Sequence, residues 1–361
     1  MEIWSAGVPA PRGILHVARD LEEQGWDGLN VVDSQNLAAD PFVALAMAAT
    51  VTTRLKLGTG VSNPITRTAA ALAASAASVQ SVSRGRMTLG IGRGDSALAH
   101  LGRAPARLKQ FERYLGHLRA YLAGEAVPFE ELVDIPAEAA PPLADLELAH
   151  APDASRIGWI ADAVAKGGRV PVEVAATGPK VIGVAARQGD RVMFALGADP
   201  ARIAWGMDVA RTARREAGLD PNGVAFGAYV PFACHSDIDV ARDLARGSLT
   251  VAARFAIMHG KTAGPLSDAS KAVMAELRQS YDMMKHTQGD SAQAAVLTPA
   301  FIDEYAVVGP PEHAVERLKA LRALGLGKVV LLGSLRPGKD GEGAVGKRLF
   351  ETEALPRLRA G

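Results

Sequence analysis

The chain has 361 residues, of which 48% are hydrophobic and 22% charged, and its formal net charge is +1. This composition is ordinary for a globular protein, and the balanced charge predicts no general attraction to nucleic acid or to an anionic membrane surface. Cys234 is the only cysteine, so we expect neither a disulfide within the chain nor a cysteine metal cluster. No stretch approaches the roughly 18–20 apolar residues that cross a bilayer, and no secretory signal is recognisable at the N-terminus, so we expect a cytoplasmic protein.

Short apolar runs, each bounded by glycine or polar residues, alternate with helix-forming segments along the chain. Strands buried on both faces read as continuous apolar runs, and eight such runs predict strands at 2–7, 27–32, 55–60, 87–91, 171–176, 190–196, 224–233 and 328–332. Helices are predicted by helical spacing, by proline near a helix start and by glycine at its end. They lie at 11–25, 69–82, 107–123, 157–166, 310–324 and 344–358, and three more are predicted by one end only: one starts at 40, one ends at 188 and one starts at 199.

Eight strands that alternate with helices, without a linker or a change of composition, predict one α/β domain with the (β/α)8 TIM-barrel fold. An open doubly wound sheet is the alternative topology. The chain exceeds the roughly 250 residues of a typical barrel because of two insertions, at about 124–152 and 238–306. The first contains several prolines and acidic residues without a clear period, and the second is mostly helical. Long insertions commonly form lids, so we expect these two to supply the lid and the substrate pocket.

Polar segments follow neighbouring strands of this predicted barrel. Residues 59–64 follow the third strand, residues 92–96 follow the fourth, and Asp33 follows the second. Ligands of parallel α/β folds bind beyond the carboxyl ends of the strands, so we expect the chemistry at this mouth. The eight histidines show neither HxH nor HExxH spacing, and we therefore predict no metal site.

Several residues at the mouth allow both a structural and a functional interpretation. Asp33 is either a helix cap or ion-pair partner, or a functional carboxylate, and Asp95 either caps the next helix or takes part in catalysis. The run 90–94 (GIGRG) departs from the dinucleotide-binding fingerprint, because its third glycine is misplaced. It is either a tight turn that needs a positive φ or bare backbone that passes close to a flat ring or a phosphate.

The segment 176–180 (ATGPK) combines a strand end, a hydroxyl, a glycine and a proline at the first position of a helix. Such a helix start offers free backbone N–H groups and the positive end of the helix dipole. Lys180 adds a positive charge at that end, where a cation is unfavourable unless an anion is present. The segment therefore favours a phosphate site over an ordinary capped helix.

Four ordered segments resemble the bacterial luciferase-like oxidoreductase superfamily. They are residues 57–67 (LGTGVSNPITR), 83–86 (SRGR), 90–95 (GIGRGD), and 178–180 (GPK) followed by 185–190 (AARQGD). Within the superfamily, the chain is most similar to methylenetetrahydromethanopterin reductases and relatives that use the deazaflavin coenzyme F420. The similarity covers most of residues 1–200 and the closing strand and helix, and it is weak across the two insertions.

The resemblance implies a TIM barrel, usually a homodimer, with the deazaflavin or flavin ring in the mouth. It implies that Asp33 lies beside the ring and that Gly60-Val61 forms a non-prolyl cis peptide behind it. It implies that Ser62 and Asn63 form hydrogen bonds with the ring edge or the polyol. It also implies that the other side of the ring is lined by Gly92, Arg93, Gly94 and Asp95, and that the phosphate is bound by Ala176, Thr177, Gly178 and Lys180.

Two residues depart from the pattern of relatives. Ser34 stands where several relatives have histidine directly after the aspartate of the second strand, and Asp95 stands where relatives of that kind have glutamate. The first departure argues against sugar-phosphate dehydrogenase chemistry, which needs that histidine as an acid or base. The second shortens the reach of the carboxyl group for any proton transfer.

The sequence therefore predicts an F420-dependent oxidoreductase that transfers a hydride between the deazaflavin and a small organic substrate. In this hypothesis Asp33 and Asp95 are the catalytic residues and orient or protonate the reacting atom. An FMN-dependent monooxygenase of the same superfamily is the alternative. A non-catalytic protein that binds a flavin or deazaflavin is a third possibility.

Overall fold

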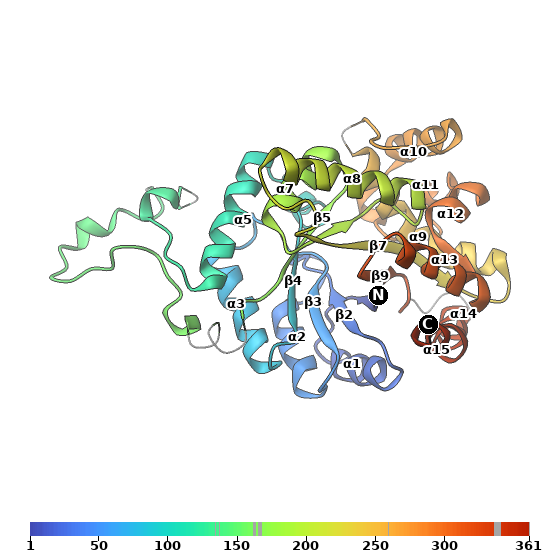
Figure 1. Cartoon of the computed structure of the whole chain (residues 1–361), viewed down its shortest axis with the longest axis horizontal. Helices are drawn as coiled ribbons and strands as arrows, with labels where there is room; N and C mark the ends of the chain where they lie inside the picture. Colours follow the sequence, from blue (N-terminus) through green and yellow to red (C-terminus); the bar gives the residue numbers. More distant parts are fainter. Residues whose placement is uncertain are drawn as a thin grey trace.

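Parallel strands form a closed barrel in the computed structural model, which describes residues 1–133, 135–136, 138–161, 164, 168–258, 260–335 and 341–360 (Figure 1). In order of hydrogen-bonded neighbours, the barrel strands are β1 (Glu2–Gly7), β2 (Gly28–Val31), β3 (Lys56–Thr59), β4 (Met87–Ile91), β5 (Val172–Ala176), β6 (Arg191–Phe194), β7 (Ala225–Cys234) and β9 (Lys328–Leu332). The ring closes through β9 and β1. The predicted TIM barrel is confirmed, and the doubly wound alternative is wrong.

The sequence analysis missed one short strand. β8 (Val307–Gly309) pairs in parallel with the last residues of β7, Phe232 to Cys234. β7 is long enough to pair with β9 through Gly227 to Pro231 and then with β8 beyond that point. Three residues are too short a run for a hydrophobic pattern to distinguish from a loop.

Helices surround the barrel, as Figure 1 shows. They are α1 (Ile14–Glu23), α2 (Pro41–Thr50), α3 (Ala69–Val82), α4 (Ser96–Ala99), α5 (Leu108–Ala123), α7 (Pro179–Gln188), α8 (Pro200–Glu216), α13 (Pro311–Ala323), α14 (Glu342–Leu349) and α15 (Leu355–Arg359). Of the predicted helix 157–166, the structure describes a 3-10 turn at Gly158–Ile160, and residues 162–163 and 165–166 lie outside the described part. No helix of the described part is both long and apolar enough to cross a membrane.

Local capping explains where the helices after β2 and β6 begin. The Asp40 carboxylate accepts hydrogen bonds from the Phe42 and Val43 amides, with Pro41 in the first turn. Asp199 likewise accepts from the Ala201 amide at the start of α8. These contacts satisfy amides that have no partner inside the helix, and they confirm the predicted helix starts.

The amino-terminal end of the barrel is closed by a buried charged cluster. The Lys328 Nζ lies 2.7 Å from Glu173 Oε2 and 3.2 Å from the centroid of the Trp4 ring, and Arg191 Nε lies 3.1 Å from Glu173 Oε1. Burial lowers the pKa of Lys328, although Glu173 opposes this change. Above this cluster, Val61 packs against buried side chains that include Trp4 and Tyr229, so the loop after β3 rests on a filled barrel.

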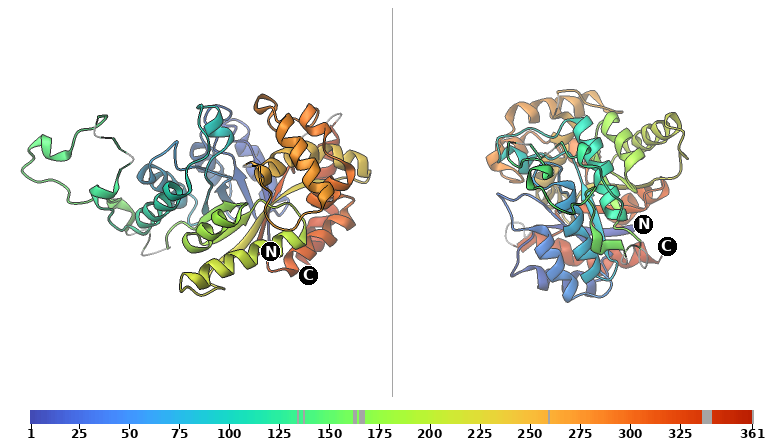
Figure 2. Two further views of the ribbon diagram at one scale, coloured as in Figure 1. Left: turned by 90° about the horizontal axis from the view of Figure 1, so that it is seen from above. Right: turned by 90° about the vertical axis from the view of Figure 1, so that its left-hand side faces the viewer.

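The first insertion forms an arm, which we define as residues 129–153. Its base is closed by the backbone pairing of Val127 with Ser155 and by a 2.7 Å hydrogen bond from the Tyr121 hydroxyl to the Ser155 hydroxyl. Beyond this base the arm extends away from the barrel (Figures 1 and 2) and carries the 3-10 turns Phe129–Glu131 and Leu143–Leu146. The arm therefore does not cover the mouth, contrary to the expectation of a lid; residues 134 and 137 lie outside the described part.

The second insertion forms a helical excursion with its own small core. It comprises α9 (Ile238–Ile257), α10 (Asp268–Ser280), the 3-10 turn Met283–Lys285, α11 (Ala292–Ala295) and α12 (Pro299–Tyr305). Buried side chains of α9, α10 and α12, among them Leu249, Met274 and Phe301, form one hydrophobic cluster. This cluster also includes Ala233 of β7 and Val308 of β8, which anchor the excursion to the barrel.

Candidate functional site

The loop after β3 contains a non-prolyl cis peptide bond between Gly60 and Val61, as the resemblance implied. Beyond this bond the chain pairs with β4: the Ser62 amide donates to the Gly90 carbonyl, and the Gly92 amide donates to the Ser62 carbonyl, both at 2.9 Å. The Thr59 hydroxyl also donates to the Gly90 carbonyl at 2.6 Å. The loops that follow β3 and β4 are therefore one hydrogen-bonded framework.

The glycines of this framework are required for two different reasons. A Cβ atom on Gly90 would lie 2.0 Å from the Thr59 carbonyl oxygen, and one on Gly92 would lie 3.1 Å from a Val61 methyl group. Gly94 has φ +86°, which disfavours other residues, and its Cβ atom would also collide with Leu98. The predicted positive-φ turn applies at Gly94, whereas Gly90 is required by the close approach of the Thr59 carbonyl; the interpretation as backbone beside a flat ring or phosphate stays a prediction.

Asp33 is buried at the carboxyl end of β2, with 3% of its surface exposed. Its Oδ2 atom accepts from the Ser62 hydroxyl at 2.7 Å and from Arg67 Nη1 at 2.5 Å. Its Oδ1 atom is buried and has no hydrogen-bond partner among the described residues. Hydrogen bonds within the protein thus hold one oxygen of this carboxylate, and the other, also buried, has no partner among the described residues.

Arg67 connects this buried carboxylate to the surface. Its second Nη atom lies 2.6 Å from Asp40 Oδ2, and its guanidinium lies 5.1 Å from the centroid of the Phe42 ring. Burial by itself would lower the pKa of Arg67, but the hydrogen bonds and charges of Asp33 and Asp40 outweigh burial and raise it. Arg67 is therefore a permanent cation that fixes the orientation of Asp33.

Asn63 is also buried beside this carboxylate, on the loop after β3. Its Oδ1 atom accepts from the Ile65 and Thr66 amides at 3.0 and 3.1 Å, which turns the chain toward Arg67. Its Nδ2 atom is buried without a hydrogen-bond partner in the described part of the chain. Asn63 therefore supplies a fixed donor on the loop whose Ser62 bonds Asp33.

Arg93 has a structural contact of its own. Its Nε atom donates to the Ala106 carbonyl at 2.6 Å, and the Ala106 amide donates back to the Arg93 carbonyl at 2.9 Å. Burial lowers the pKa of this guanidinium. Arg93 thus connects the loop after β4 to the segment that leads into α5.

Asp95 does not cap the helix that follows it. Its side chain makes no capping hydrogen bond with α4; its Oδ2 atom instead accepts from Arg254 Nη1 of α9 in an ion pair. The Arg254 guanidinium lies 4.7 Å from the centroid of the Tyr281 ring, and the Tyr281 hydroxyl lies 2.7 Å from His286 Nδ1. The excursion therefore contacts the mouth through a side chain of α9.

The start of α7 has the features of an anion site. Gly178 is extended and provides no side-chain cap, and Pro179 occupies the first turn, so the first amides of α7 point away without an internal partner. Open space surrounds the position where a Gly178 Cβ would lie, and Lys180 is exposed beside it. Ala176 ends β5 and Thr177 follows it, and β5 pairs with β4, so this helix start adjoins the framework of the β3 and β4 loops.

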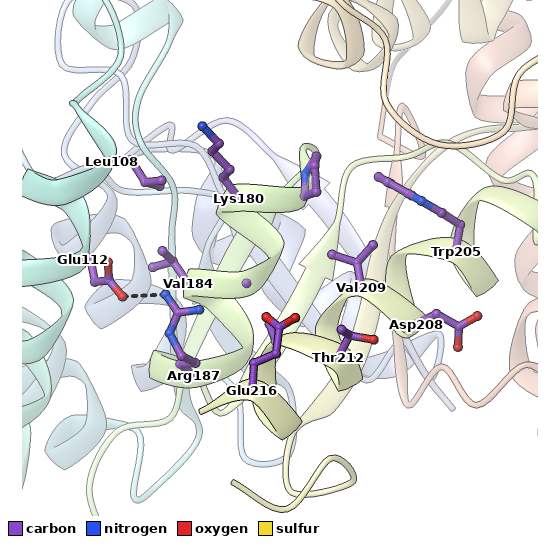
Figure 3. Close-up of a pocket in the computed structure, with 13 residues that line it drawn as sticks. Leu108, Glu112, Lys180, Val184, Arg187, Trp205, Asp208, Val209, Thr212 and Glu216 are labelled. Atoms are coloured by element: carbon purple, nitrogen blue, oxygen red, sulfur yellow. Dashed lines mark hydrogen bonds and ion pairs between the residues drawn. The ribbon is translucent and has the colours of Figure 1, made fainter. Parts of the chain in front are cut away.

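A groove of the described structure lies outside the barrel rather than in its mouth. This groove, of about 580 Å³, runs between α5, α7 and α8 (Figure 3) and includes Lys180, Arg187, Trp205 and Val209. A 2.7 Å ion pair between Arg187 and Glu112 closes one side. Neither Asp33 nor Asp95 lines this groove. No cluster of three or more His, Cys, Asp or Glu residues in the described part could hold a metal ion.

Sequence reasoning did not identify three residues that shape the mouth. Arg67 stands inside the loop that was singled out, yet its partner Asp33 is 34 positions away. Arg254 and Tyr281 belong to the excursion, whose sequence pattern was uninformative. An Asp33 partner could have been sought among nearby cations, but nothing in the sequence indicates the pairing of Asp95 with a residue 159 positions away.

Comparisons with known proteins agree with this geometry. The family model described as luciferase-like monooxygenase matches residues 3–327. A 5,10-methylenetetrahydromethanopterin reductase from Methanolobus tindarius is 26% identical over 340 residues, which cover 91% of this chain and 92% of the relative.

Two solved structures share the fold over 99% of both chains. The coenzyme F420-dependent tetrahydromethanopterin reductase from Methanopyrus kandleri has a TM-score of 0.70 at 18% identity. An F420-dependent secondary alcohol dehydrogenase, solved with an F420-acetone adduct, has a TM-score of 0.69 at 17% identity.

Proposed function

We propose that this chain, which belongs to the luciferase-like monooxygenase family, is an F420-dependent oxidoreductase that transfers a hydride between the deazaflavin and a small organic substrate. The observation that carries the proposal is the pair of unsatisfied buried atoms at the mouth, Asp33 Oδ1 and Asn63 Nδ2, next to the cis peptide loop. The full-length similarity to a methylenetetrahydromethanopterin reductase supports F420 as the coenzyme.

The residues at the mouth fit such a coenzyme. Buried polar atoms without partners are costly unless a ligand or water satisfies them, and here one is an acceptor and the other a donor. We assign the ring and polyol to Asp33, Gly60, Val61, Ser62 and Asn63, the opposite side to Gly92, Arg93 and Gly94, and the phosphate to Ala176, Thr177, Gly178 and Lys180. When bound, the deazaflavin supplies hydride chemistry at its central carbon.

The protein's own groups then orient the reactants and exclude water. Asp33 and Asp95 each accept a hydrogen bond from an arginine, which fixes the direction in which each carboxylate points. We therefore assign both residues the task of orienting polar groups of the coenzyme and substrate. The excursion, and not the arm, is positioned to shape the substrate pocket, because its Arg254 reaches the loop after β4.

An anaerobic assay tests this function directly. Reduced coenzyme F420 is mixed with the protein and with a panel of methylenetetrahydropterins, ketones and aldehydes, and oxidation of the coenzyme is followed by its absorbance. We expect turnover with a member of the panel and loss of detectable turnover in Asp33→Ala and Asp95→Ala. Asp95→Ala should retain the coenzyme, whereas Asp33→Ala should bind it more weakly and is assayed at a coenzyme concentration that saturates it. Full activity of both variants would refute the assignment of these residues.

An FMN-dependent monooxygenase is the second candidate, and the description of the matching family favours it. This candidate predicts a yellow protein that retains FMN through gel filtration and consumes oxygen when the flavin is reduced. If the protein does not bind FMN and does not react with oxygen, the FMN-dependent monooxygenase is excluded.

We further propose that the chain works in the cytoplasm as a homodimer, with a small-molecule substrate and without a nucleic-acid partner. Its formal net charge of +1 supports the absence of a nucleic-acid partner. Light scattering of the purified protein tests the dimer: a mass twice that of the 37.7 kDa chain is expected, and a single-chain mass contradicts it.

A further inference from the structure

The loop after β4 is held by the excursion rather than by its own helix. Asp95 makes no side-chain cap with α4, which is only four residues long. Its carboxylate instead forms the ion pair with Arg254, in the last turn of α9. The Asp95 side chain is 9% exposed and the Arg254 side chain 18% exposed, so the pair is largely shielded from solvent and from screening by salt.

Arg254 is itself fixed on its other side. Its guanidinium lies over the ring of Tyr281, 4.7 Å from the centroid, in the arrangement of a cation–π contact. The Tyr281 hydroxyl is 2.7 Å from His286 Nδ1, which ties the ring to the turn that follows α10. Arg254 is thus held between the loop after β4 and the segment 281–286 of the excursion.

We propose that Arg254 is a positioning residue for the reaction: by holding Asp95 from α9, it fixes the loop after β4 against the excursion and sets the orientation of the Asp95 carboxylate. This inference rests on the proposed function, because it concerns the same mouth. The part of the loop after β4 that is assigned to the coenzyme has an anchor of its own, because the Gly92 amide donates to the Ser62 carbonyl at 2.9 Å, whereas the contact with Arg254 is made by Asp95. Loss of Arg254 therefore impairs the use of the substrate while leaving the binding of the coenzyme intact.

The decisive variant is Arg254→Gln, with Arg242→Gln as its matched control. Arg242 also lies on α9, is similarly exposed, and pairs with Asp239 and Asp303, away from the mouth. Misplacement of a reactive group by about 1 Å costs as much as a hundredfold in rate. We expect kcat/KM of Arg254→Gln to fall about tenfold to a hundredfold, with the Kd for coenzyme F420 changed by less than about twofold, and activity of Arg242→Gln to remain that of the native chain.

A conservative variant and a double variant separate positioning from general stability. Arg254→Lys keeps a cation at this site, and we expect it to recover part of the lost kcat/KM. If Arg254 acts through Asp95, the double variant Arg254→Gln, Asp95→Asn is no worse than the more impaired single variant. Additive losses, no rescue by lysine, or equal losses in Arg254→Gln and Arg242→Gln would each overturn the proposal.

Hydrogen exchange of the ligand-free protein provides a readout that needs no substrate. We expect amides of residues 95–106 to exchange faster in Arg254→Gln and at the native rate in Arg242→Gln, because local opening reports loss of the contacts that hold a segment. Unchanged exchange in Arg254→Gln contradicts the proposal. If the native protein fails to bind coenzyme F420, the proposed function fails, and the exchange result still decides whether Arg254 holds the loop.

Discussion

Asp33 is a buried carboxylate whose two oxygens have different roles. Ser62 and Arg67 donate to Oδ2, whereas Oδ1 has no partner among the described residues. Arg67 in turn is bonded to Asp40, the residue whose carboxylate caps the start of α2. A charge held in this way is available to a ligand without a further rearrangement of the side chain.

Replacement of Asp33 by asparagine tests this arrangement. Asp33→Asn removes the buried carboxylate that pairs with Arg67. We expect the free energy of unfolding to fall by about 1–3 kcal/mol. This is less than for a fully buried pair, because Arg67 keeps its ion pair with Asp40. We also expect the affinity for coenzyme F420 to fall by at least about tenfold, as measured by fluorescence titration beside chemical denaturation.

Asp40→Asn is the matched control for this variant. Asparagine keeps the cap of α2 and removes an ion pair whose carboxylate is 45% exposed, which is worth little. A loss of coenzyme affinity in Asp40→Asn as large as in Asp33→Asn would contradict a specific role for Asp33.

Asp190 provides a prediction about pH. Partial burial by itself would raise the pKa of this carboxyl, but the hydrogen bonds from Arg169 and the Val172 amide lower it below its ordinary value of 3.8. A lowered pKa in the folded state stabilises the fold above about pH 4, and this stabilisation disappears as the pH falls through the folded-state value.

The variant Asp190→Asn measures this contribution by chemical denaturation at several pH values. We expect it to be about 1–2 kcal/mol less stable than the native chain at pH 7, a figure reduced because Asp190 is 35% exposed. The difference should shrink below about pH 4. A difference that stays constant or grows as the pH falls would show that the stabilisation is not linked to the charge of Asp190.

At the scale of elements, the barrel and the arm differ in how they are held. The barrel strands pair on both sides and pack against helices. The described residues of the arm are mostly exposed; its contacts with the barrel include the packing of Leu132 against the main core and the 3.1 Å approach of Glu131 to His117 of α5. The prolines of residues 128–152 remove backbone donors and favour extended chain. The arm therefore contributes little to the stability of the barrel.

Replacement of the arm by a short linker tests this difference. A chain in which four glycine or serine residues replace residues 133–153 of the arm keeps the pairing of Val127 with Ser155 and the contacts of Glu131 and Leu132. Because loop length affects stability only weakly, we expect its melting temperature to lie within about 2 °C of the native value and its affinity for coenzyme F420 to be unchanged. A large loss of either property would show that the replaced residues pack on the barrel or its mouth.

The eight barrel strands and most helix starts could be predicted because their signals are local. A strand buried on both faces is a continuous apolar run, and Asp40-Pro41 marks a helix start within two residues. β8 and the course of the arm had no such signal. The cis peptide at Gly60-Val61 followed from resemblance alone, and the pairing of Asp95 with Arg254 depends on the tertiary packing of an excursion that the barrel pattern does not constrain.

At the scale of the whole molecule, a filled barrel supports a mouth assembled from the ends of four neighbouring strands, β2 to β5, and one distant helix, α9. The loops after β3 and β4 and the start of α7 belong to the barrel, while Arg254 comes from the separately packed excursion. Under the proposed assignment, the coenzyme would lie on the barrel part of the chain and the substrate on the inserted part. The identity of the coenzyme is thus the claim on which the remaining assignments depend.

That claim is tested most directly by titrating the protein with coenzyme F420 and with FMN at the same salt concentration, and following the intrinsic fluorescence of its four tryptophans. We predict saturable quenching by coenzyme F420 with a Kd at least about tenfold lower than that for FMN, and weaker quenching in Asp33→Asn. Tighter binding of FMN, or the absence of saturable quenching by either compound, would contradict the account.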